Sequence, residues 1–139
     1  MADGRWAIVV ATFYSDLAQQ LVDGAQRVFS GTADVYEVPG AFELPLAARY
    51  CADAGYDGVA CLGAVIRGET SHYDYVCSSA AEGILRVSLE TFVPCSFGVL
   101  TVENMEQALA RLGEKRHQGE DAARAVLRMA ALRREIGAP

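Results

Sequence analysis

Residues 61–77 read CLGAVIRGETSHYDYVC and join the end of an apolar run to the beginning of a helix. The run spans residues 58–63, and a polar loop follows it. From residue 73 to residue 90, apolar side chains recur at intervals of three and four, which predicts a helix with one buried face. A buried strand, a polar loop and an amphipathic helix in this order indicate an α/β fold with a parallel sheet.

The loop in this stretch brings polar side chains close together: Arg67, Glu69, Thr70, Ser71 and His72. We expect His72 at or just before the helix start. The free backbone N–H groups and the helix dipole at such a position favour an anion and disfavour a protonated imidazole. The simpler interpretation is a solvated turn in which Thr70 or Ser71 caps the helix.

The glycine spacing of this loop imitates a nucleotide-binding P-loop, G-x-x-x-x-G-K-[ST]. Gly63, Gly68 and Thr70 fit the pattern, but Glu69 occupies the position of the lysine. A carboxylate there would repel the phosphates that the lysine attracts. We therefore exclude a nucleoside triphosphate site and keep a smaller phosphate near this loop as a hypothesis.

Apolar periodicity and turn residues predict four strands that alternate with helices along the rest of the chain. The strands are expected at 6–11, 34–38, 56–63 and 92–100. The helices are expected at 16–29, 41–55, 73–90, 102–112 and 120–136, with Thr101 as the N-cap of the fourth. Continuously apolar strands such as 6–11 are covered on both faces. We predict a single domain, 1–139, with a three-layer α/β/α fold around a four-stranded parallel sheet.

The composition argues against several classes of protein. A net charge of −6, with no run of basic residues longer than two, does not suit a nucleic-acid surface. No apolar stretch approaches the ~18 residues of a membrane span, and the first residues do not resemble a signal peptide, so we expect a cytoplasmic protein. The four cysteines and two histidines lack the spacing of a disulfide framework or a metal site. We therefore predict reduced thiols and no metal.

Candidate site residues follow each predicted strand. Ligands of parallel α/β sheets bind beyond the carboxyl ends of the strands. Four segments are expected at that edge: Phe13, residues 41–43, residues 64–72 and residues 97–101. They would bring aromatic rings, a carboxylate, a histidine and an anion-binding helix start together. The combination suggests a site for a small planar heterocycle and a phosphate.

Each of these residues also has an ordinary structural interpretation. Phe13 and Phe97 taken singly are typical of core side chains. Glu43 is typical of an acid in the first turn of a helix, where it favours the dipole. His72 is compatible with a plain surface position. Their joint position at one edge of the sheet favours a functional site, because a core does not require such a cluster of polar groups.

Three longer motifs then identify a resemblance. VPGAFELP at 38–45, LGAVIRGETSHYDYV at 62–76 and FGVLTVENMEQA at 97–108, together with Phe13 and Arg111, resemble the lumazine synthase family. The resemblance covers about residues 6–135 without a large insertion and implies a flavodoxin-like sheet. Two of the motifs are long and specific.

The resemblance implies a role for each matching residue. Phe13 would stack on a pyrimidine, and the ribityl chain would be held by Ala41, Phe42 and Glu43. The pyrimidine would also contact the backbone of Ala64, Val65 and Ile66, and Phe97 would come from a neighbouring subunit. The substrate phosphate would be bound by Glu69 and Thr70 with Arg111 as the cationic partner, and His72 would transfer protons.

The reaction implied by the resemblance joins two small molecules, 5-amino-6-(D-ribitylamino)uracil and 3,4-dihydroxy-2-butanone 4-phosphate. An amine attacks a ketone to give an imine, phosphate is eliminated, and the ring closes with loss of water. No cofactor is expected, because the electrophile carries its own leaving group. The enzyme would hold the two reactants together and move protons.

Two departures from the family pattern bear on the phosphate site and the assembly. Members often have Asn-Lys-Gly before the last helix, whereas this chain has His117-Gln118-Gly119. Lys115, Arg116 or His117 would have to replace that lysine, or Arg111 acts alone and phosphate binds more weakly. The N-terminal segment is short, and the loop at 113–118 lacks the glycines of capsid-forming members. We therefore expect a homopentamer or a decamer with sites between subunits.

Other functions remain open at this point. The chain could be a lumazine- or flavin-binding protein without turnover, or a shell or scaffold protein. A flavodoxin-like electron carrier is disfavoured, because no Ser/Thr-rich phosphate loop follows the first strand.

Overall fold

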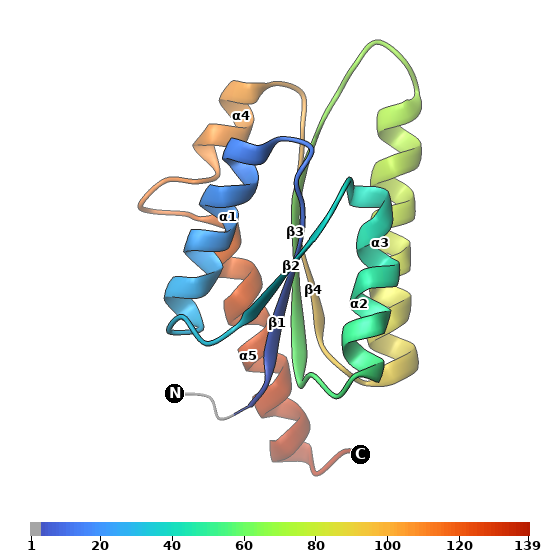
Figure 1. The fold of residues 1–139 in the computed structure, drawn as a ribbon, viewed down its shortest axis with the longest axis vertical. Coiled ribbons are helices and arrows are strands. Elements are labelled where there is room, and N and C mark those ends of the chain that lie inside the picture. Colours follow the sequence, from blue (N-terminus) through green and yellow to red (C-terminus); the bar gives the residue numbers. More distant parts are fainter. Residues whose placement is uncertain (1–3) are drawn as a thin grey trace.

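The computed structural model describes residues 4–139, which form a three-layer α/β/α fold (Figure 1). The strands are β1 Trp6–Ala11, β2 Asp34–Val38, β3 Gly58–Ile66 and β4 Cys95–Val102. The helices are α1 Ser15–Val28, α2 Leu44–Asp53, α3 His72–Thr91, α4 Met105–Ala110 and α5 Gln118–Ile136, and a 3₁₀ turn, η1, spans Ala41–Glu43. The predicted fold class is confirmed.

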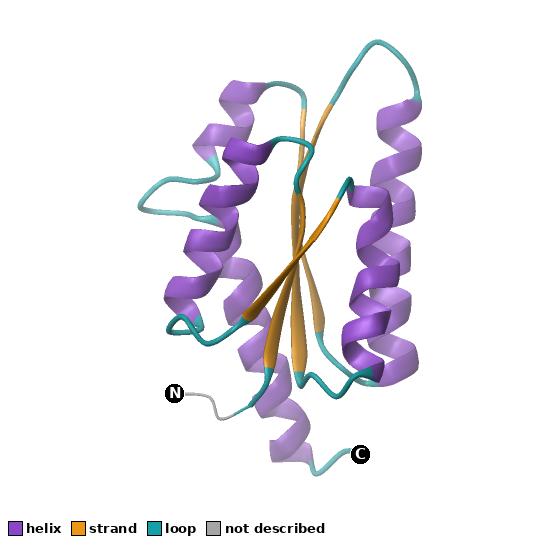
Figure 2. Ribbon diagram, in the orientation of Figure 1, coloured by secondary structure: helices purple, strands orange, loops and turns teal. Residues whose placement is uncertain are grey.

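The sheet is parallel throughout and has the strand order β2-β1-β3-β4. Helices α1, α4 and α5 cover one face, and α2 and α3 cover the other (Figure 2). Because every strand runs in the same direction, the carboxyl ends of all four lie at one edge of the sheet. This edge is the place where parallel α/β sheets bind their ligands.

Side chains of the central strands alternate between two apolar clusters. Ile8 and Leu62 pack with residues of α1 and α5 on one face. Val9 and Cys61 pack with residues of α2 and α3 on the other. Both faces are therefore buried, which explains why these strands are continuously apolar in sequence. A register slip of one residue would exchange the two clusters, so the packing fixes the register.

Both ends of β3 and of β4 differ from the prediction: β3 begins at Gly58 and not at residue 56, and β4 ends at Val102 and not at residue 100. β3 continues through Ile66 because residues 64–66 extend the ladder with β4, where Ala64 lies opposite Leu100. β4 begins at Cys95 and not at residue 92, because Phe92 ends α3 in a left-handed conformation with φ of 60°. The proline just before Cys95 has no N–H to donate to a sheet.

The predicted N-cap of the fourth helix is wrong. Thr101 lies inside β4, opposite Val65, and the helix begins at Met105. Its N-cap is Asn104, whose side-chain oxygen accepts a hydrogen bond of 2.9 Å from the Gln107 N–H. A β-branched threonine suits a strand, whereas asparagine is among the strongest N-caps.

Helix α5 begins two residues earlier than predicted, at Gln118, because His117 caps it. The buried His117 ring accepts a hydrogen bond of 3.2 Å at Nδ1 from the Gly119 N–H. The helix then packs so closely on α1 that a Cβ at Gly119 would lie 2.2 Å from the Leu21 carbonyl oxygen. The charged residues before His117 concealed this cap in the sequence.

The structure also bears on the cysteines and on membrane insertion. All four cysteines are free, with Cys51 and Cys61 buried. Among residues 4–139, none of the helices has the length and apolar character that crossing a membrane requires.

Candidate active site

A cavity of about 710 Å³ opens at the carboxyl edge of the sheet, between the ends of β1 and β3, the η1 turn and the start of α3. Most of the residues predicted for the site line it: Phe13, Ala41, Phe42, Glu43, Ala64, Val65, Ile66, Thr70 and His72. The sheet topology therefore brings together segments that lie far apart in the sequence.

Two phenylalanine rings form an aromatic wall of the cavity. Phe13 is 76% exposed and Phe42 is 61% exposed. The Tyr14 ring supports Phe13 in an edge-on contact with the ring centroids 4.9 Å apart. The core interpretation of Phe13 is therefore wrong. Exposed apolar rings gathered beside a cavity mark a binding surface, and their faces suit a planar ligand.

The η1 turn places Glu43 at the rim of the cavity. Its Oε1 accepts a hydrogen bond of 3.0 Å from the Gly40 N–H, so the carboxylate closes the turn on itself. The buried side chains of Ala41 and Leu44 anchor the turn in the core. Glu43 thus has the structural role of an acid at a helix start, as its simpler interpretation predicts, while it also lines the cavity.

The end of β3 forms the inner wall of the cavity. Ala64 is buried, and Val65 and Ile66 are half-buried. All three are paired with β4. This pairing holds their backbone in the extended form, so a ligand meets a rigid strand end.

The loop after β3 leads directly into α3 and carries the histidine. His72 is exposed and is the first residue of α3, as predicted. Its backbone N–H donates a hydrogen bond of 3.2 Å to the Thr70 hydroxyl, so Thr70 satisfies one N–H of the helix start. Thr70 therefore acts partly as the simple cap that was considered from the sequence. The helix dipole still favours an anion at this end of the cavity.

Tyrosines at the cavity were missed by the sequence analysis. Tyr14, Tyr73 and Tyr75 all line it. Burial, followed by the neighbouring Cys77, raises the pKa of the Tyr73 phenol. Each of the three stands within three positions of Phe13 or His72, and that adjacency was the available signal.

Comparison with known proteins agrees with this geometry. Residues 3–134 match the model of the 6,7-dimethyl-8-ribityllumazine synthase family. The chain belongs to this family. A 6,7-dimethyl-8-ribityllumazine synthase from Salinibacter ruber is 45% identical over 141 residues, which cover 95% of this chain and 90% of that protein. The enzymes of the same name from Limosilactobacillus reuteri (43% over 135 residues; 93% and 89% covered) and Chlorobium phaeobacteroides (45% over 140 residues; 95% and 90% covered) are similar to it as well.

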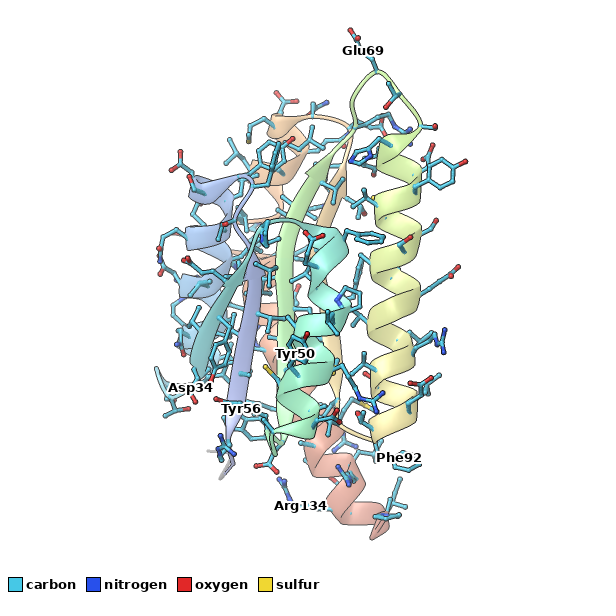
Figure 3. The ribbon with its side chains drawn as sticks, turned by 45° about the vertical axis from the view of Figure 1, so that its right-hand side comes forward. Asp34, Tyr50, Tyr56, Glu69, Phe92 and Arg134 are labelled. Atoms are coloured by element: carbon cyan, nitrogen blue, oxygen red, sulfur yellow. The ribbon has the colours of Figure 1, made fainter. Side chains whose placement is uncertain are left out.

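Three residues that the lumazine synthase resemblance implicated lie outside the cavity of their own chain. Glu69 is at the tip of the loop and points away from the ribbon (Figure 3). Arg111 follows α4, in the helical layer on the other side of the sheet, and its Nη1 donates to the Gln107 carbonyl at 2.9 Å. Phe97 lies opposite Cys61, near the start of β4 and not at its carboxyl end.

His117 stands where the lumazine synthase family often has the asparagine of Asn-Lys-Gly, and it lies away from the candidate active site. His117 lines a second cavity of about 470 Å³ beside α1, with Asp23, Arg27 and Glu120 among its neighbours. Burial, and then the charge of Arg27, lowers the pKa of the His117 imidazole. The ring is therefore engaged as a neutral helix cap and is not available to replace the missing lysine.

Proposed function

We propose that the protein condenses 5-amino-6-(D-ribitylamino)uracil with 3,4-dihydroxy-2-butanone 4-phosphate to give 6,7-dimethyl-8-ribityllumazine, a step of riboflavin biosynthesis. One observation carries this proposal. A single cavity gathers the aromatic wall, the η1 turn, the end of β3 and His72, from segments that the family resemblance had implicated separately. The family membership of the chain supports the same reaction.

The uracil substrate would occupy the aromatic side of the cavity. Stacking on Phe13 suits its flat ring, and the paired backbone at Ala64 to Ile66 offers a rigid edge for its polar groups. The η1 turn would hold the ribityl chain, with Phe42 beside the chain and Glu43 accepting from its hydroxyl groups. Orientation of two reactants in this way contributes about 7–11 kcal/mol to lowering the barrier.

The phosphate of the second substrate would lie against the loop after β3 and the start of α3. Thr70 and the helix dipole favour an anion there. His72 stands at the same helix start and would move protons during imine formation, elimination of phosphate and ring closure. Histidine is suited to this task because its ordinary pKa lies near neutral pH.

An oligomer would complete the site. Phe97 and Arg111 are exposed, and neither lines the cavity of its own chain. We infer that a neighbouring subunit supplies both, so that Arg111 neutralises the phosphate and Phe97 covers the uracil. A homopentamer or a pair of pentamers, located in the cytoplasm, would provide such shared sites.

The test is an assay of the purified protein with both substrates, followed by lumazine absorbance and fluorescence. We expect turnover by the wild type, and loss of general acid–base catalysis in His72→Ala should lower kcat by about 10²-fold. Arg111→Ala should raise KM for the butanone phosphate, whereas the exposed Arg128→Ala should change nothing. Lumazine binding without turnover would refute the proposal in favour of a binding protein.

A further inference from the structure

Arg67 lies between two residues that line the cavity, Ile66 and Gly68, and contacts three neighbouring segments of the fold. Its backbone N–H extends the sheet by donating to the Val102 carbonyl at 2.9 Å. Its Nε lies 2.9 and 3.0 Å from the two carboxylate oxygens of Glu103. Its Nη1 lies 3.4 Å from Oδ1 of Asp74, and its guanidinium carbon is 4.3 Å from the centre of the Tyr73 ring.

These contacts join the two ends of the loop that precedes α3. Arg67 stands at the beginning of the loop, directly after β3, whereas Tyr73 and Asp74 belong to the first turn of α3. The guanidinium therefore spans the base of residues 68–72. Those five residues are all exposed, so packing contributes little to holding them in place. Three of them, Gly68, Thr70 and His72, line the cavity.

Glu103 is itself held firmly. Its N–H donates to the Gln107 side-chain oxygen at 2.7 Å, and the Gln107 N–H donates to Asn104 at 2.9 Å. Asn104 is the N-cap of α4, and the Gln107 side chain reaches back to the residue before it, so the Glu103 backbone is fixed at the start of α4. The loop base is thus tied, through Arg67, to a fixed point outside the loop.

We propose that Arg67 is a positioning residue that sets the loop 68–72, and with it Thr70 and His72, in the geometry required for the phosphate substrate. The identity of that substrate rests on the proposed function. The planar guanidinium fork is essential in this arrangement, because it stacks on Tyr73 while it engages carboxylates on two sides.

Arg67 also controls the charge near the proposed phosphate position. Asp74 and Glu103 are two carboxylates close to the loop base, and Arg67 contacts both. Without the arginine, their negative charges would be uncompensated beside an incoming phosphate. Exposed ion pairs contribute little to global stability, so the effect belongs to the loop and to substrate affinity, and unfolding should change little.

The test compares Arg67→Met and Arg67→Lys with the wild type. The matched control is Arg86→Met, which removes another exposed arginine–glutamate pair from α3, far along the helix from the cavity. Hydrogen exchange of the amides at 68–72 measures the loop directly and requires no turnover. Steady-state kinetics then measure KM for each of the two substrates.

We expect Arg67→Met to accelerate exchange at 68–72 and to raise KM for the butanone phosphate about tenfold to a hundredfold, with KM for the uracil changed less than twofold. Arg67→Lys should give intermediate values, since it keeps the charge but loses the fork. Arg86→Met should match the wild type.

Unchanged exchange at 68–72 in Arg67→Met would overturn the proposal, as would an equal rise in both KM values accompanied by a lower melting temperature. Glu103→Gln provides a second variant that weakens the same contacts without altering Arg67, and it should reproduce the faster exchange. If the wild type forms no lumazine while Arg67→Met still accelerates exchange, the proposed function fails and the positioning role of Arg67 on the loop stands.

Discussion

Replacing His117 tests whether a neutral imidazole caps the N-terminus of α5. The ring is 7% exposed, and its Nδ1 accepts from the Gly119 N–H at 3.2 Å. It also lies tightly against α1, where a Cβ at Gly24 would come within 2.3 Å of the ring. Protonation of Nδ1 would turn the acceptor of the cap into a donor, so the cap and a charged ring are incompatible.

The direction in which the stability of the protein changes with pH follows from the lowered pKa of His117. Burial is the main cause, and Arg27 of α1 adds to it, while Asp23, Glu120 and Asp121 act in the opposite sense. Because the folded state holds this proton less tightly than the unfolded state, the unfolded state binds more protons near neutral pH. The stability that His117 contributes is therefore present above about pH 6.5, the ordinary value for histidine, and is lost as pH falls through the folded-state pKa.

The expected change in the free energy of unfolding has two parts, the loss of the cap and the loss of the titrating ring. His117→Ala removes the cap, which costs about 1 kcal/mol where the ring is neutral, and also removes the packing of the buried ring against α1, so the melting temperature should fall by at least roughly 4 °C. His117→Asn keeps an oxygen acceptor at the N-cap but cannot titrate. Since one proton is involved, the free energies of unfolding of the wild type and His117→Asn diverge by at most about 1.4 kcal/mol per pH unit.

The measurement is urea unfolding of the wild type, His117→Ala and His117→Asn at about pH 5.5 and about pH 8, where free carboxylic acids stay ionised. Protein concentration is kept fixed, because assembly contributes to apparent stability. We expect the wild type to lose stability between pH 8 and pH 5.5 relative to His117→Asn. Parallel pH curves would refute the reasoning. His72→Asn is the control. If the stability of the wild type relative to His72→Asn changed with pH as much as it does relative to His117→Asn, the effect would not depend on the surroundings of His117.

Two further predictions follow from the cavity and from the contact between α1 and α5. Phe13→Ala should raise KM for the uracil substrate about tenfold while leaving the melting temperature nearly unchanged, because the ring is exposed; an unaltered KM would remove Phe13 from the site. Gly119→Ala should lower the free energy of unfolding by about 1–3 kcal/mol, since its Cβ would meet the Leu21 carbonyl oxygen at 2.2 Å. Gly113→Ala, where a Cβ meets nothing within 4 Å, is the control, and equal stability of the two variants in urea unfolding would contradict the overlap.

Most of the sheet and much of the site could be predicted from local patterns. The run at Trp6–Ala11 matches β1 without change, and the periodicity after residue 72 matches α3 closely. Continuous apolar runs report burial on both faces, and parallel topology then sends every carboxyl end to one edge. That rule was sufficient to bring Phe13, Glu43 and His72 to one cavity.

Strand ends were predicted less well, because they depend on partners and not on composition. Ile66 is in β3 only because Val102 of β4 lies opposite it, and no pattern within 61–77 contains that information. Thr101 was assigned to a helix start for the same reason, since a threonine before a polar segment is compatible with either structure. Asn104 is the N-cap because its side chain accepts from the Gln107 N–H. An asparagine three residues before a glutamine could have suggested this cap from the sequence.

The sequence by itself determined the fold class, the family and the edge of the sheet where the cavity lies, because these depend on residue type and spacing along the chain. Only the tertiary structure decided that Arg67 spans the loop base, that His117 is buried against α1 as a cap, and that Arg111 lies outside the cavity of its own chain. The physical reason is the range of the interactions. Periodicity reports which face of an element is buried, whereas hydrogen bonds and ion pairs between side chains require that elements distant in sequence be brought within a few ångströms.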